Sequence, residues 1–173
     1  MPAILSFAQW LQYTGWASAL RYSETVYPVV LTLHMIGMAF FGGLILFTNL
    51  RLLGWTMKRL PLSKVVKALR VPKRFGFVLT VGCGILMASS KAEEYYYNPF
   101  FWAKMSLLFL IAIHGLVFGQ SVYRSKDAGD PPNAKLAGGL SLLLWTCVMI
   151  CGRGIGYVEP PLDKLHAMVF RLF

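Results

Sequence analysis

Four apolar segments of near membrane-spanning length are the feature that most constrains this chain. A helix needs about 20 mostly apolar residues to cross the roughly 30 Å hydrocarbon core of a bilayer. Such segments occupy about residues 26–50, 75–90, 99–122 and 136–158, and the short second one has room to extend back to Pro72 or on into Lys91. Hydrophobic residues make up 57% of the 173 residues, which is typical of an integral membrane protein. The sequence therefore predicts an all-α fold with a single membrane domain over residues 1–173.

Polar and turn-forming residues between these segments predict an up-down four-helix bundle. Ser23 suits the start of the first span, and a stretch with two prolines, residues 59–72, separates it from the second. Asn98-Pro99 begins the third span, and residues 126–133 form a turn before the fourth. Short connections of this kind make successive helices antiparallel neighbours.

The two ends of the chain predict amphipathic helices on the membrane surface. Ile4, Phe7 and Leu11 form an apolar stripe, and the aromatic residues among them suit the headgroup level. Residues 162–172 also carry apolar side chains at helical spacing. We expect an interfacial helix at each terminus.

The net charge of +10 is explained by the loops. The connection between the first two spans contains no acid and seven bases, namely Lys58, Arg59, Lys64, Lys67, Arg70, Lys73 and Arg74. The positive-inside rule places such a loop in the cytoplasm and both termini outside. Residues 63–70 within it predict a short amphipathic helix on the anionic inner leaflet. The basic charge thus indicates lipid as the partner and no nucleic acid.

Two histidines lie inside the apolar segments and are candidate functional residues. His34 belongs to the first span and His114 to the third. An ionisable ring in hydrocarbon is costly, so such residues usually serve a function. Two rings on different spans predict axial ligation of one haem iron between them. Their depths, about 12 Å and about 21 Å from the outer edge at 1.5 Å per residue, match poorly. Interhelical hydrogen bonds are the alternative role.

Other residues fit the same haem hypothesis. Gly37 lies one turn from His34 and gives room for a flat ring, although glycines also permit close packing of helices. Lys104 and Arg153 are candidate partners for the propionates, unless they pair with glutamates of the chain. His166, in the C-terminal helix, is an alternative iron ligand.

The remaining chemistry-bearing residues give weaker signals. Three cysteines lie in spans two and four without a C-x-x-C-H motif, which excludes covalent haem attachment and suggests packing residues. Aromatic residues 95–97 and 100–102 either line a quinone site or form an interfacial belt. No nucleotide-binding or hydrolytic motif occurs in the sequence, so a stand-alone enzyme is not indicated.

The pattern Glu24-x3-Pro28-x5-His34-x2-Gly37, the stretch Leu50-Arg51-Leu52-Leu53-Gly54, and Tyr97-Asn98-Pro99 with Lys104 resemble an uncharacterised bacterial family of small four-span membrane proteins. An acid often precedes the Leu-Arg-Leu-Leu-Gly stretch in that family, and Asn49 takes its place here. More loosely, two histidines on separate spans resemble membrane b-type cytochrome subunits. Those subunits usually hold two haems on four histidines, whereas this chain has three histidines. The resemblance implies a multi-pass protein of the bacterial inner membrane.

The sequence therefore predicts a membrane b-type cytochrome or electron-transfer subunit with one haem b, linked to quinone and to a larger membrane complex or a homo-oligomer. The alternative is a non-catalytic accessory subunit of a respiratory or photosynthetic complex that binds lipid or pigment. In the alternative, each histidine ligates one pigment or joins two helices.

Overall fold

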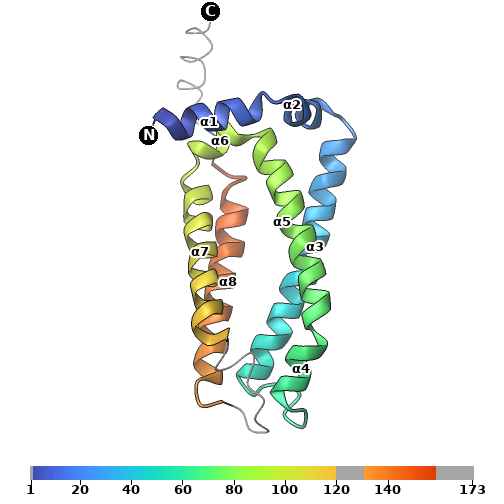
Figure 1. The fold of residues 1–173 in the computed structure, drawn as a ribbon, viewed down its shortest axis with the longest axis vertical. Coiled ribbons are helices and arrows are strands. Elements are labelled where there is room, and N and C mark those ends of the chain that lie inside the picture. Colours follow the sequence, from blue (N-terminus) through green and yellow to red (C-terminus); the bar gives the residue numbers. More distant parts are fainter. Residues whose placement is uncertain (1, 120–130, 159–173) are drawn as a thin grey trace, which may run out of the picture.

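The computed structural model describes residues 2–119 and 131–158 of the chain, and these residues form helices and turns without a strand. The helices are α1 (Pro2–Gln12), α2 (Gly15–Tyr22), α3 (Val26–Leu52), α4 (Leu62–Ala68), α5 (Arg70–Ser90), α6 (Ala92–Tyr96), α7 (Pro99–Gly119) and α8 (Ala134–Gly154). Figure 1 shows α3, α5, α7 and α8 running up and down along the long axis. The predicted all-α, four-span fold is confirmed.

The four long helices α3, α5, α7 and α8 are each long and apolar enough to cross a membrane. Many of their large apolar side chains are exposed, including Phe109, Leu116 and Ile150. In water such a surface would be costly, whereas hydrocarbon is its natural solvent. The chain is therefore a multi-pass membrane protein. Below, the upper end means the end covered by α1, α2 and α6, and the lower end means the end beside α4 (Figure 1).

Helix α5 begins at Arg70, five residues before the predicted start of the second span. Pro72 was expected to end the preceding loop, but it lies in the first turn of α5. Proline is tolerated there because the first N–H groups of a helix have no partner within it. Lys73 and Arg74 consequently belong to the spanning helix. The fourth span is shorter than predicted, because α8 ends at Gly154.

Local capping explains where two spans begin. Ser23 Oγ accepts the main-chain N–H of Val26 at 3.0 Å, next to the start of α3. Asn98 Oδ1 accepts the N–H of Phe100 at 3.0 Å and that of Phe101 at 3.4 Å. Pro99, between Asn98 and Phe100, occupies the first helical position of α7, where its missing N–H costs nothing. Both starts agree with the sequence prediction.

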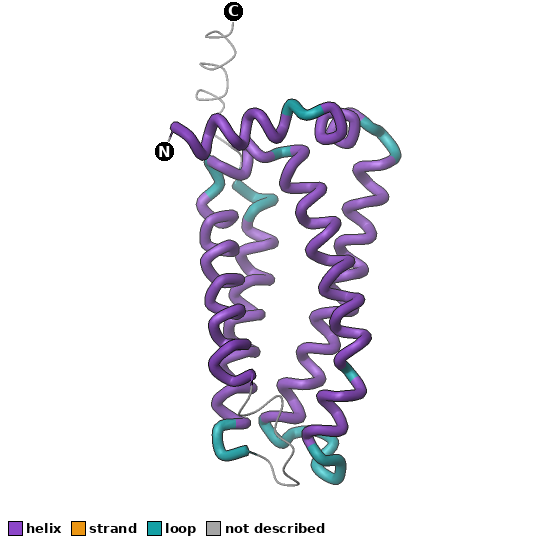
Figure 2. Tube along the Cα trace, in the orientation of Figure 1, coloured by secondary structure: helices purple, strands orange, loops and turns teal. Residues whose placement is uncertain are grey.

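The long helices pack as two pairs, and one helix of each pair contacts the other pair. Helix α3 packs against α5, α7 packs against α8, and α3 also packs against α8. Among the described residues, α5 and α7 are not in contact, and Figure 2 shows them apart along most of their length. Close approach within α3–α5 depends on glycine: a Cβ on Gly37 would lie 2.9 Å from Thr80 Oγ1, and one on Gly76 would lie 3.1 Å from Phe41 Cβ.

The predicted N-terminal surface helix is present as two helices that lie across the upper end (Figure 1). Ile4 and Phe7 of the predicted apolar stripe are exposed, while Gln12 is buried. The stripe therefore faces away from the bundle, as an interfacial helix requires. The predicted amphipathic helix at the lower end is also present as α4. The predicted C-terminal helix lies outside the described residues.

Candidate functional site

Three aromatic side chains form a layer across the interior, about midway between the ends of the bundle. Phe41 of α3 meets Trp145 of α8 edge to face, with ring centroids 5.4 Å apart, and Phe77 of α5 with centroids 5.8 Å apart. Edge-to-face pairs at these distances are favourable contacts. We call Phe41, Phe77 and Trp145 the aromatic layer. Polar side chains face the interior on both sides of it.

On the upper side of the aromatic layer, His34 links α3 to α5. His34 Nδ1 donates a hydrogen bond to the Thr80 carbonyl at 2.8 Å, since the carbonyl can only accept. Gly84 leaves room for the ring, because a Cβ there would lie 3.1 Å from His34 Cε1. A neutral imidazole that donates from Nδ1 has its lone pair on Nε2, and no hydrogen bond to Nε2 occurs in the described part of the chain.

Lys104 of α7 approaches His34 from the opposite helix pair. A Cβ on Gly152 of α8 would lie 3.6 Å from Lys104 Nζ, which places the ammonium against α8. Lys104 also lies close enough to His34 for the two charges to influence each other. His34, Thr80, Gly84 and Lys104 together are called the upper histidine site. The described glutamates are Glu24, Glu93 and Glu94, and none of them forms an ion pair with Lys104.

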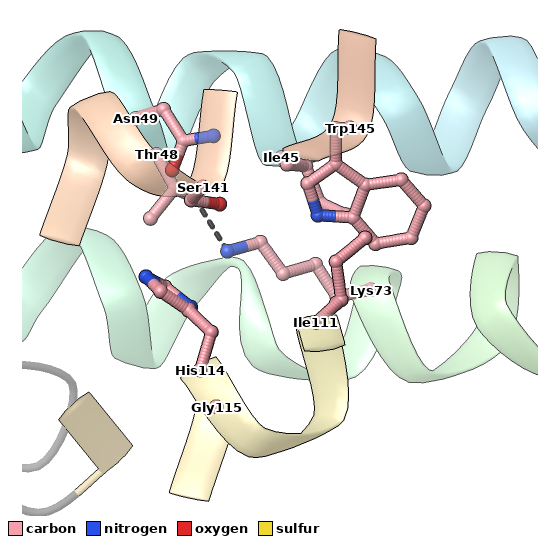
Figure 3. A pocket seen from close by; sticks show the side chains of 9 residues that line it. All are labelled: Ile45, Thr48, Asn49, Lys73, Ile111, His114, Gly115, Ser141 and Trp145. Atoms are coloured by element: carbon pink, nitrogen blue, oxygen red, sulfur yellow. Dashed lines mark hydrogen bonds between the residues drawn. The ribbon is translucent and has the colours of Figure 1, made fainter. Parts of the chain in front are cut away.

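Below the aromatic layer lies a pocket of about 170 Å³ with both polar and apolar lining, drawn in Figure 3 and called the lower pocket. It is lined by residues of all four long helices. They are Ile45, Thr48 and Asn49 of α3, Lys73 of α5, Ile111, His114 and Gly115 of α7, and Ser141 and Trp145 of α8. The lower pocket is thus the place where the two helix pairs share polar side chains.

Lys73 is the cation of the lower pocket. Its Nζ donates to Thr48 Oγ1 at 2.5 Å, and the Thr48 hydroxyl in turn donates to the Leu44 carbonyl at 2.9 Å (Figure 3). An ammonium has three protons to donate, and only this one hydrogen bond of Lys73 occurs among the described residues. Asn49 is 1% exposed, and its Nδ2 has no hydrogen-bond partner among the described residues.

His114 also lines the lower pocket but is turned toward α8. Its Nε2 donates to the Ala137 carbonyl at 3.0 Å, and its ring packs against Phe118 with centroids 4.9 Å apart. The side chain is 7% exposed. His114 thus joins α7 to α8 much as His34 joins α3 to α5.

The structure does not bring His34 and His114 together. His114 shares the lower pocket with Thr48 and Asn49, which follow His34 by about four turns of α3, or roughly 20 Å along its axis. The aromatic layer lies between the two rings. One iron cannot be ligated by both, because its two axial nitrogens must each lie within a few ångströms. The expected bis-histidine haem site therefore does not fit this arrangement.

The other predicted site residues lie in different parts of the bundle. Gly37 packs against Thr80 and so serves the α3–α5 contact, while Lys104 belongs to the upper histidine site. Arg153 is exposed at the upper end of α8, with its guanidinium 5.3 Å from the ring centre of Tyr157. His166 lies outside the described residues. Of these residues, the structure places Gly37 and Lys104 near His34, and it places Arg153 at the upper end of α8.

Neither the cysteines nor the acids gather into a metal site in the described ranges. Cys83, Cys147 and Cys151 are free thiols, and no group of three or more His, Cys, Asp or Glu side chains occurs there. At the upper end, Tyr95 and Phe101 stack with centroids 5.3 Å apart, and Trp102 Nε1 donates to the Tyr96 carbonyl at 2.9 Å. These aromatic residues contact one another, as members of an interfacial belt do.

Sequence reasoning missed Lys73 as a site residue because it was assigned to a solvated basic loop. The spacing between Lys73 and later residues of α5 is the signal that could have identified it. Lys73, Phe77, Thr80 and Gly84 recur at intervals of three or four residues, which places them on one face of a helix. Extending the second span back through Pro72 would have put a lysine on the packed face of α5.

Comparison with known families identifies one match. The model of a family of unknown function, DUF6644, matches residues 8–158, and the chain belongs to that family. No curated protein matches the chain, and no solved structure matches it. Nothing in these comparisons supports the looser likeness to b-type cytochrome subunits.

Proposed function

We propose that this member of the DUF6644 family is a membrane haem protein that carries one b-type haem on His34. The observation that supports this function is the hydrogen bond from His34 Nδ1 to the Thr80 carbonyl. A metal-ligating histidine nearly always donates its other ring N–H to a carbonyl or carboxylate, which fixes the tautomer and the ring orientation. His34 has this arrangement, with its Nε2 lone pair as the candidate iron ligand.

Two further residues near His34 bear on haem binding. Gly84 of α5 leaves room for the His34 ring. Lys104 supplies a cation on the facing helix pair without a carboxylate partner in the described chain. A haem propionate is an anion that such a cation would bind. The exposed Arg153 is the second candidate for a propionate.

The bound haem would supply one-electron transfer, with quinone as its candidate partner in the membrane. The chain itself would hold the iron through His34, orient that ring through Thr80, and exclude water with the aromatic layer. The protein would then act as an electron carrier or as a subunit of a larger complex in the bacterial inner membrane. The bases in and beside α4, Lys58, Arg59, Lys64, Lys67 and Arg70, support a cytoplasmic position of the lower end. Both termini would then lie outside.

The test is a visible spectrum of the detergent-purified protein, oxidised and reduced by dithionite, with haem quantified per chain. The proposal expects about one haem per chain, with a Soret band that shifts on reduction. His34→Ala should abolish haem binding, while His114→Ala should leave the Soret band and its shift unchanged. Loss of haem in both variants would contradict ligation by His34 alone. A featureless spectrum from folded wild-type protein would contradict the proposal.

An accessory subunit without a redox cofactor is the second candidate function. It is favoured by the fact that each histidine joins two neighbouring helices, His34 through Thr80 and His114 through Ala137. Histidines that only connect helices need no guest. In this case both alanine variants should lower stability by similar amounts, and the wild-type protein should co-purify with a larger membrane complex. A pigment on one histidine would instead give its own absorption bands.

A further inference from the structure

We propose that a groove between α3 and α4 binds an acyl chain of an anionic phospholipid, with the lipid headgroup beside Lys64. Helix α4 packs against the lower end of α3 (Figure 1). The groove, called the α4 groove, has a volume of about 480 Å³ and is lined by Leu44, Phe47, Met57, Leu60, Lys64, Val65, Ala68 and Leu69. No residue of the upper histidine site lines it, so the inference does not depend on the haem proposal.

The lining of the α4 groove is apolar except for Lys64. Phe47, Met57 and Leu60 are about half exposed, so the groove opens at the surface of the molecule. An apolar opening of this kind is costly in water and favourable against hydrocarbon. Its volume lies within the roughly 300–1,000 Å³ of pockets that enclose small ligands. An unbranched acyl chain is the apolar group that the surrounding membrane supplies.

Contacts behind the α4 groove fix its walls. Arg51 of α3 is 3% exposed, and its Nε and Nη2 donate to the Leu60 carbonyl at 3.2 and 2.9 Å. The Leu60 N–H in turn donates to the Met57 carbonyl at 3.0 Å. On α4, the buried Leu62 packs in one apolar cluster with Leu52 of α3. The groove is therefore formed before a ligand enters, which lowers the entropy cost of binding.

The charge beside the α4 groove selects the kind of lipid. Lys64 is the charged residue of the lining, and the chain has no acid between Glu24 and Glu93. Further exposed bases in and next to α4 are Lys58, Arg59, Lys67 and Arg70. Bases at the inner surface of a membrane attract anionic headgroups. An acyl chain alone does not distinguish one lipid from another, whereas this charge favours an anionic phospholipid over a zwitterionic one.

The spacing of the α4 residues separates Lys64 from its neighbour Lys67. Lys64 and Ala68 are four residues apart, as are Val65 and Leu69, so these two pairs form one helical face toward the groove. Lys67 is exposed and does not line the groove. Lys64→Met and Lys67→Met therefore remove the same charge from one helix, inside and outside the proposed site.

The experiment is photolabelling of the full-length protein in phosphatidylcholine vesicles that contain a trace of phosphatidylglycerol with a diazirine on one acyl chain. We expect labelling to concentrate on residues 44–47 and 65–69 and to be competed by unlabelled phosphatidylglycerol. Lys64→Met should raise the mole fraction of competitor that halves this labelling about fivefold, the effect of one base beside anionic lipid. Lys67→Met should leave that fraction unchanged. Phosphatidylcholine with the same photoreactive chain should label these residues about fivefold less.

Ala68→Trp tests the groove without changing the charge. Ala68 is exposed, so the variant should fold, while the indole fills the space and lowers labelling of residues 44–47 severalfold. Val71→Trp, at a 73% exposed residue of α5 outside the lining, is the matched control and should label as the wild type does. Equal labelling by the two lipids would overturn the proposal, because only annular acyl chains would then contact the groove. Equal effects of Lys64→Met and Lys67→Met, or unchanged labelling of Ala68→Trp, would also overturn it.

Discussion

Gln12 of α1 accepts the main-chain N–H of Glu93 in α6, with Oε1 at 3.0 Å from the amide nitrogen. Both residues are buried at the upper end, although they are far apart in the sequence. The bond satisfies an N–H at the start of α6 that has no partner within the helix. One side chain thus fixes the N-terminal helix to the connection between α5 and α7.

Gln12→Ala should therefore destabilise the protein by about 1–3 kcal/mol, the cost of leaving a buried N–H unsatisfied. The measurement is reversible unfolding by SDS in mixed micelles. Gln9→Ala is the matched control. Gln9 Nε2 donates to the Glu93 carboxylate at 3.2 Å, and this contact is only partly buried. The control should cost less, and an equal cost in both variants would contradict the special role of Gln12.

Gly138→Ala should destabilise the contact between α3 and α8 by about 1–3 kcal/mol through overpacking. A Cβ at this position would lie 2.8 Å from Leu52 Cβ and 3.1 Å from the Asn49 carbonyl oxygen. Neither atom can move without a shift of the α3 backbone. Gly139→Ala, one residue along, meets only Leu53 Cδ2 at 3.9 Å. It should be neutral, or stabilising by up to about 1 kcal/mol through helix propensity. Thermal unfolding in detergent compares the two variants, and a stable Gly138→Ala would refute the packing geometry.

Asn98→Ala should lower stability by about 1–2 kcal/mol, because it removes the cap of α7. It also removes the donation from Asn98 Nδ2 to the Ile155 carbonyl at 3.1 Å, which ties α7 to the end of α8. Asn98→Asp keeps the capping acceptor but loses this donor, so its stability should lie between that of wild type and Asn98→Ala. If Asn98→Asp were no more stable than Asn98→Ala, the assigned capping role of the side-chain oxygen would be contradicted.

Tyr95 should make the protein less stable at high pH. Burial, with smaller contributions from Tyr27 and Glu94, raises the pKa of Tyr95 to about 12. The unfolded chain loses this phenolic proton near pH 10, before the folded chain does. Deprotonation then favours unfolding, so the stability present below pH 10 is lost as the pH rises from 10 to 12. Tyr95→Phe should show a smaller fall in Tm over this range.

The matched control for this pH dependence is Tyr13→Phe, at an exposed tyrosine between α1 and α2. Lysines also titrate in the same range, so the quantity to compare is the difference from wild type at each pH. If Tyr95→Phe and Tyr13→Phe follow the same curve as the wild type, the burial of Tyr95 does not govern alkaline stability.

The spans were predictable because hydropathy reports the solvent of a helix directly. Membrane-length apolar segments, Ser23 before α3 and Asn98-Pro99 before α7 are local signals, and the structure confirms them. The start of α5 at Arg70 was predicted only as an alternative extension back to Pro72, since proline acts as a helix breaker in most contexts but is tolerated in a first turn. Sequence reasoning therefore placed Lys73 outside the bundle.

The candidate site was less predictable because it depends on which helices become neighbours. The sequence identified His34 and His114 and predicted that they lie at different depths in the membrane. It could not show that α3 pairs with α5 and α7 with α8. This pairing gives each histidine its own carbonyl partner. The meeting of Thr48, Asn49 and Lys73 likewise follows from packing between helices that are distant in sequence. No local pattern encodes such a contact.

The aromatic layer of Phe41, Phe77 and Trp145 has an electrical consequence. Moving one elementary charge through a membrane potential involves about 2.3 kcal/mol per 100 mV. The rings of Phe41 and Phe77 carry no hydrogen-bonding group, so they interrupt the row of polar side chains between Lys104 and Lys73. A charge that moved from one lysine to the other would have to leave its polar partners and cross this apolar level of the bundle. The two lysines are therefore expected to respond to a membrane potential as separate charges.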